Sequence, residues 1–222
     1  MWDEAVLVAG KDLRIEWRSK VALGQLVPFS LLVLVLFAFA LDPERGVLSR
    51  VASGLYWVAV LFSTTLAVQR AFSIESADGA RDALRLSGLR PASVFVGKAA
   101  AIGAQLLVLE FVLGIGIVVL YSLDVAGWPL LAATAVAATL CLASAGTLYG
   151  ALAAGVRARE SLLPLLFLPV VAPVLIGATE AFEAALGGVE SEGWPWCGFL
   201  VLLGLVYTLL GAQLFGSILE ES

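Results

Sequence analysis

The sequence predicts an all-α integral membrane protein with six transmembrane helices, an amphipathic N-terminal interfacial helix, and both termini in the cytoplasm. Hydrophobic residues make up 61% of the 222 positions, compared with about 45–50% in soluble domains. The apolar residues gather into six segments, each about as long as the 20-residue helix that crosses a hydrocarbon core. The connectors between them carry nearly all of their Lys and Arg on alternate sides.

The six segments fill most of the chain and leave too few residues for a soluble catalytic domain. They are Val21–Leu41, Val51–Gln69, Val94–Tyr121, Trp128–Val156, Ser161–Phe182 and Trp194–Leu219. The first is longer than the 7–15 apolar residues usual in a signal peptide, so we expect it to remain as a crossing. We therefore divide the chain into an interfacial helix at 1–20 and a transmembrane domain at 21–222.

The distribution of basic residues predicts the orientation. With the N-terminus inside, only Arg45 and Arg50 fall outside. The other basic residues all fall inside, and they are Lys11, Arg14, Arg18, Lys20, Arg70, Arg81, Arg85, Arg90, Lys98, Arg157 and Arg159. This is a strong positive-inside bias.

Residues 2–20 carry charges throughout and are not expected to cross the membrane. At 100° per residue, an apolar stripe covers one side of the predicted helix and most charges lie off it. The stripe consists of Trp2, Val6, Ala9, Leu13 and Trp17. Such a helix is typical of one lying in the interface, with tryptophans at the depth of the lipid headgroups.

The longest polar connector spans residues 70–93 and is expected on the cytoplasmic side. Charged and apolar residues alternate near 78–88, and Gly88 and Pro91 follow them. These are helix stop signals, so the pattern predicts a short surface helix there.

The fifth segment contains Pro164, Pro169 and Pro173. Each removes a backbone donor and is expected to kink or break the helix. Either the kink serves packing against neighbouring helices, or the segment is a re-entrant or movable gating element.

Glu110 lies near the middle of the third segment. An isolated charge there costs roughly 2.5–3.5 kcal/mol on insertion scales, so the carboxyl group should be paired, protonated or directed into the bundle. It either handles a proton or a substrate, or it is a hydrogen-bonded packing residue or faces a subunit interface.

Several catalytic classes find no support in the sequence. Histidine is absent and the only methionine is Met1, so the usual haem axial ligands and common zinc sites are missing. Gly97-Lys98 is followed by Ala99, so the P-loop pattern is absent as well. We expect no catalytic residues, no metal and no bound cofactor in this chain.

A series of short motifs runs along the whole chain in a defined order. They are Lys11-Asp-Leu-Arg14 with Arg18-Ser-Lys20, Phe37-Ala-Phe-Ala-Leu-Asp-Pro43, Glu75-x-x-Asp-Gly79, Leu123-Asp-Val-Ala-Gly-Trp128, and Leu162-Leu-Pro-Leu-Leu-Phe-Leu-Pro169 through Pro173. In order and spacing the chain resembles the CcmB family, the ABC-2-type permease subunits of the bacterial cytochrome c maturation transporter.

The resemblance implies a non-catalytic permease subunit in the bacterial cytoplasmic (inner) membrane. Its expected partners are the ATPase CcmA, the proteins CcmC, CcmD and CcmE, membrane lipid and a second copy of itself, with no nucleic acid. Haem would be handled by the complex, through ATP-driven release of haem-loaded CcmE or through haem export.

The resemblance also implies that the 70–93 connector is where the ATPase docks. The expected coupling residues are Glu75, Asp78, Gly79, Ala83 and Leu84. Two alternatives stay open at this point. One is an ABC-2-type exporter permease for a lipid or drug, and the other is a stand-alone proton-linked carrier or channel that uses Glu110.

Overall fold

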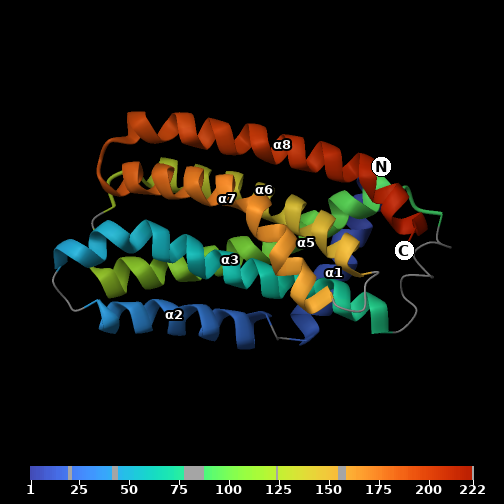
Figure 1. The fold of residues 1–222 in the computed structure, drawn as a ribbon, viewed down its shortest axis with the longest axis horizontal. Coiled ribbons are helices and arrows are strands. Elements are labelled where there is room, and N and C mark those ends of the chain that lie inside the picture. The colour runs from blue at the N-terminus through green and yellow to red at the C-terminus, as the bar shows by residue number, and fades with distance from the viewer. Residues whose placement is uncertain (20–21, 42–44, 78–87, 124, 155–158, 222) are drawn as a thin grey trace.

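The computed structural model describes residues 1–19, 22–41, 45–77, 88–123, 125–154 and 159–221, and all regular elements in these ranges are helices (Figure 1). The elements are α1 (Trp2–Ser19), the π-helical turn η1 (Ala22–Leu26), α2 (Val27–Ala40), α3 (Arg45–Ala77), α5 (Pro91–Tyr121), α6 (Trp128–Ala154), α7 (Arg159–Leu186) and α8 (Glu190–Glu221). The predicted all-helical class is confirmed.

Five of the described helices are by themselves long and apolar enough to cross a membrane, namely α3, α5, α6, α7 and α8. The first predicted segment differs, because η1 interrupts it and leaves α2 with 14 residues. At 1.5 Å per residue, α2 spans about 21 Å, which is shorter than the hydrocarbon core. Helix α2 is long and apolar enough to cross only when it is taken together with α1, from which it is bent. Counting this pair as one crossing gives up to six crossings.

The long helices run side by side, and the two chain termini lie at the same end of the bundle (Figure 1). Helix α1 crosses this end, where α3 finishes and α5 begins. Arg45 and Arg50 open α3 at its other end. The bundle therefore separates these two arginines from the basic residues of α1, and the side of the membrane that each end faces stays a prediction.

Helix α6 lies at the centre of the bundle and contacts α3, α5, α7 and α8. In the most apolar 18-residue stretch of α6, 72% is buried inside the protein, whereas in the corresponding stretch of α8 only 22% is buried. The exposed side chains of α8 are mostly large and apolar, including Leu202, Leu205 and Leu209. Such a surface is suited to hydrocarbon rather than to water.

Hydrogen bonds between side chains and neighbouring helices join the bundle at several levels. Examples are Tyr121 Oη to the Leu34 carbonyl (3.0 Å), Ser144 Oγ with Thr208 Oγ1 (2.8 Å), Ser53 Oγ to Glu183 Oε1 (3.0 Å) and Cys141 Sγ to the Leu200 carbonyl (3.1 Å). In a membrane each such bond contributes roughly 0.6 kcal/mol on average, so their number matters more than any one of them.

Small residues set the distances between several helices. A Cβ atom on Gly146 of α6 would lie 2.6 Å from Val68 Cγ2 of α3, and one on Gly97 of α5 would lie 2.6 Å from the Ala5 carbonyl oxygen of α1. The glycines therefore permit approaches that no larger residue allows, as is common where membrane helices cross closely.

The three prolines of the fifth segment do not divide it, because α7 is helical from Arg159 to Leu186. Figure 1 shows that the helix changes direction along its length. Pro173 lacks the N–H that would bond the carbonyl of residue 169. At the adjacent Val170, the carbonyl accepts a hydrogen bond from Tyr207 Oη of α8 at 2.8 Å. This hydrogen bond joins α7 to α8 next to the carbonyl that Pro173 leaves without its helical donor.

The contact at Gly97 predicts that Gly97→Ala will destabilise the protein by about 1–3 kcal/mol, the usual cost of overpacking. The new methyl group would meet the backbone of α1, which cannot move aside as a side chain can. The midpoint of thermal unfolding in detergent, followed by size-exclusion chromatography, measures the effect. Gly114→Ala on the same helix is the control, because no atom lies within 4 Å of its Cβ position. Equal midpoints for the two variants would contradict the prediction.

Candidate functional site at the junction of the first helix with the bundle

Helix α1 contacts the bundle through a face that differs from its apolar stripe. Ala5, Val8 and Glu16 are buried, whereas Trp2 is 70% and Trp17 77% exposed. The predicted stripe therefore lies on the outside of the protein, as expected for an interfacial helix whose apolar side enters the lipid.

Two ion pairs attach α1 to two different helices. Lys98 Nζ of α5 lies 3.4 Å from Asp12 Oδ2, and Arg70 Nε of α3 lies 3.1 Å from Glu16 Oε2. Arg70 also donates a hydrogen bond through Nη2 to Ser19 Oγ at 3.0 Å. Asp12 and Glu16 are four residues apart, so they project from one side of α1 toward these partners.

Lys98 is the most deeply buried charge of this cluster, with 2% of its side chain exposed. Its ammonium group also lies 5.1 Å from the centre of the Phe72 ring of α3, which is cation–π distance. A buried charge costs several kcal/mol when unpaired, and both Asp12 and Phe72 help to stabilise the charge of Lys98 at this position. Lys98 thus connects α1, α3 and α5.

In the sequence, the predicted coupling residues fall at the end of α3 and in the segment that leads from α3 to α5. Glu75 is in the last turns of α3. Asp78, Gly79, Ala83 and Leu84 lie outside the described residues, as does the predicted surface helix except Gly88. Gly88 has a left-handed backbone (φ 68°), and Pro91 begins α5 soon afterwards.

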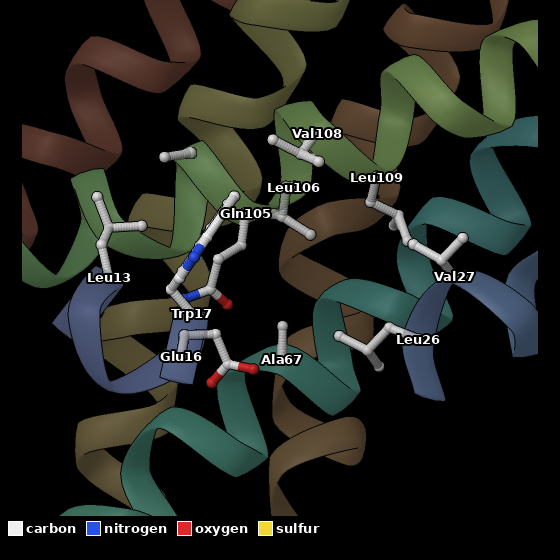
Figure 2. Close-up of a pocket in the computed structure, with 11 residues that line it drawn as sticks. Leu13, Glu16, Trp17, Leu26, Val27, Ala67, Gln105, Leu106, Val108 and Leu109 are labelled. Carbon is white, nitrogen blue, oxygen red and sulfur yellow. The ribbon is translucent and has the colours of Figure 1, made fainter. Parts of the chain in front are cut away.

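An apolar pocket of about 300 Å³ adjoins the ion pairs, enclosed by α1, the start of α2, α3 and α5 (Figure 2). Its lining is almost entirely hydrophobic and consists of Leu13, Trp17, Leu26, Val27, Ala67, Ala104, Leu106, Val108 and Leu109 with the polar Glu16 and Gln105. Figure 2 shows the Gln105 amide pointing into the pocket near Trp17 and Glu16.

Glu110 lies deeper in the bundle and does not line this pocket. Its side chain is buried, and its Oε1 accepts a hydrogen bond from Thr139 Oγ1 of α6 at 2.7 Å. Tyr56 Oη of α3 donates to the Glu110 backbone carbonyl at 3.0 Å. Glu110 Oε2 has no hydrogen-bond partner among the described residues. The residue therefore bridges α3, α5 and α6.

The described residues contain no group of three or more His, Cys, Asp or Glu side chains arranged to hold a metal ion.

The sequence alone did not predict the two ion pairs of α1, because charges on an amphipathic helix are normally expected to face water. Two signals were available. Lys98 stands inside an apolar run, and Asp12 and Glu16 share a face away from the stripe.

Comparison with known proteins places the chain among membrane transport components. The model of the CcmB protein family matches residues 4–218. Heme exporter protein B of Paracoccus denitrificans is 33% identical over 184 residues, covering 81% of this chain and 83% of the relative. The proteins of the same name from Haemophilus influenzae and Escherichia coli K12 are 33% and 34% identical, each covering 87% of this chain and 86% of the relative.

The burial of Lys98 predicts that Asp12→Ala will destabilise the protein by about 3 kcal/mol, because the buried ammonium group would lose this ion pair. The double variant Asp12→Leu with Lys98→Met should recover most of this loss, since two apolar side chains need no partner. Denaturant unfolding in detergent, followed by tryptophan fluorescence, gives the free energies.

Lys11→Ala is the matched control, because Lys11 Nζ pairs with Asp12 Oδ1 at 2.9 Å but its side chain is 44% exposed. It should cost less than about 1 kcal/mol. A double variant no more stable than Asp12→Ala would show that the charge of Lys98 is not the cause.

Proposed function

The chain belongs to the CcmB family, and from this premise we propose that it is the membrane permease subunit of an ABC-type haem exporter that serves cytochrome c maturation. The relatives named above are heme exporter proteins and share 33–34% of their residues with it across most of both chains. Within this role the subunit contributes no catalytic groups, and a partner ATPase supplies the energy.

The observation that carries the mechanism is that α1 is bonded to both α3 and α5, the helices on either side of the predicted connector. That connector is shorter than the expected 70–93, because α3 includes residues 70–77 and α5 begins at Pro91. Arg70 lies about two turns before the end of α3 and Lys98 about two turns after the beginning of α5, and both pair with α1. A displacement at the connector therefore cannot move α3 and α5 without also moving α1. Helix α1 leads through η1 into α2, so the motion continues into the membrane-spanning part.

We place the ATPase at the end of the bundle that holds this junction, which makes it the cytoplasmic end. The basic residues of α1 gather there with Arg70 of α3 and Lys98 of α5, whereas Arg45 and Arg50 lie at the other end of α3, in agreement with the positive-inside rule. The specific partners are CcmA as ATPase, CcmC, CcmD and CcmE, and a second copy of this chain. Haem is handled by the assembled complex, and the lipid- or drug-exporter alternative finds no support in the family match.

For Glu110 the proposed role is structural. Its contacts are the Thr139 hydroxyl and, through its backbone, the Tyr56 hydroxyl. The pocket near α1 does not reach it. A hydrogen-bonded bridge between three helices accounts for a carboxyl group at this depth without a proton pathway, which disfavours the stand-alone carrier.

The proposal predicts that Asp78→Lys will reduce ATPase-dependent cytochrome c assembly about fivefold or more, the usual size of coupling between two sites. Glu192→Lys is the control, because this exposed acid begins α8 at the opposite end of the bundle. Complementation of a bacterium lacking its own permease subunit measures function. Co-purification of the ATPase measures docking. Equal function of Asp78→Lys and the control would contradict the proposed docking site.

The structural role of Glu110 predicts that Glu110→Gln retains both assembly activity and stability, since glutamine keeps an acceptor oxygen for Thr139. Glu110→Leu should lower the free energy of unfolding by about 0.5–1.5 kcal/mol. Adding Thr139→Val should lower it little further, because both substitutions remove the same hydrogen bond. A double-mutant cycle in detergent measures the coupling. Loss of activity in a stable Glu110→Gln variant would instead favour proton handling.

A further inference from the structure

We infer that the pocket between α1, α2, α3 and α5 is a binding site for one acyl chain of an anionic membrane phospholipid. The pocket has a buried floor and an exposed rim. Leu26, Ala67 and Leu106 form part of the floor and are 9%, 2% and 1% exposed. Trp17 and Val108 lie on the rim and are 77% and 52% exposed. An opening of this kind admits a chain from the side while its end is enclosed.

The chemistry of the lining selects the kind of ligand. Nine of the eleven lining residues are apolar, which suits a hydrocarbon chain. At about 300 Å³ the pocket is at the lower limit of small-molecule sites, which is adequate for part of a chain rather than for a large planar ligand.

The two polar lining groups stand where the chain would meet its ester groups. The Gln105 amide points into the pocket beside Trp17, and it makes no hydrogen bond to any residue that the structure describes. It therefore has donors free for an ester carbonyl. Glu16 is already paired with Arg70 at 3.1 Å, so its charge does not repel an anionic ligand.

The surroundings of the rim indicate the headgroup. Arg14 directly follows Leu13, and Arg18 directly follows Trp17. Both arginines are exposed on α1. At 100° per residue, they lie beyond Trp17 on the side away from the buried face. Indole rings favour headgroup depth. The helix therefore sets a basic surface at the height of the phosphate and an apolar pocket below it, which is complementary to an anionic phospholipid.

The site is tested with photoactivatable lipids in nanodiscs that hold the complex purified from membranes. The probes are phosphatidylglycerol and phosphatidylcholine, each with a diazirine in one acyl chain. We expect phosphatidylglycerol to label peptides containing residues 13–17 or 104–109 several-fold more than the exposed face of α8 around Leu202 and Leu209. Ala104→Phe fills the pocket and should remove most of this excess.

Ala100→Phe, one turn earlier on the exposed side of α5, is the matched control and should retain the labelling. Arg14→Gln lies outside the packed interior, so it tests the headgroup without risk to folding. It should lower phosphatidylglycerol labelling to the phosphatidylcholine level, whereas Arg90→Gln at the start of α5 should not.

Two results would overturn the proposal. In the first, labelling of the pocket does not exceed that of α8, or is the same in Ala104→Phe and Ala100→Phe. In the second, labelling is low in the complex and rises when this chain is purified alone, which would mean that a neighbouring subunit fills the pocket. Neither result bears on the haem-exporter role, because that role is measured by cytochrome c assembly.

Discussion

The burial of Lys98 is the constraint on which the architecture of the candidate site depends. An ammonium group that is 2% exposed requires a counter-charge, and Asp12 of α1 provides it at 3.4 Å. This requirement positions α1 across α5, and Gly97 permits the close approach because it has no side chain. Once α1 lies there, Glu16 reaches Arg70 on α3. One buried charge thus determines how an interfacial helix is joined to two membrane helices.

The same arrangement connects structure to the proposed function. A permease subunit has to convert displacement at its surface into displacement within the membrane, and this requires rigid contacts at the point of entry. Ion pairs in a partly buried, low-dielectric setting are stronger than on an open surface. Deeper in the bundle, the contacts are neutral hydrogen bonds, such as Tyr56 to Glu110 and Tyr207 to Val170. Within the described part of the chain, the ion pairs between helices are therefore found where movement is expected to begin.

The π-helical turn η1 has a further consequence for the membrane-spanning part. It separates α1 from α2 and leaves α2 shorter than a full crossing. The pocket opens beside this break, with Leu26 and Val27 contributing to its lining. The proposed lipid site therefore lies beside the turn that precedes the short helix α2.

Much of the fold was predictable from the sequence, since length and apolar composition decide which segments can cross a bilayer. The predicted segments at α3, α5, α6, α7 and α8 each lie mostly within a helix, and the family followed from the order of short motifs. The sequence also determined that α1 is amphipathic. Only the tertiary structure decided that Asp12 and Glu16 face protein rather than water, because the positions of Lys98 and Arg70 depend on how distant segments pack. It also decided that Glu110 meets Thr139 and that α7 continues through three prolines, since such hydrogen-bond partners come from other helices.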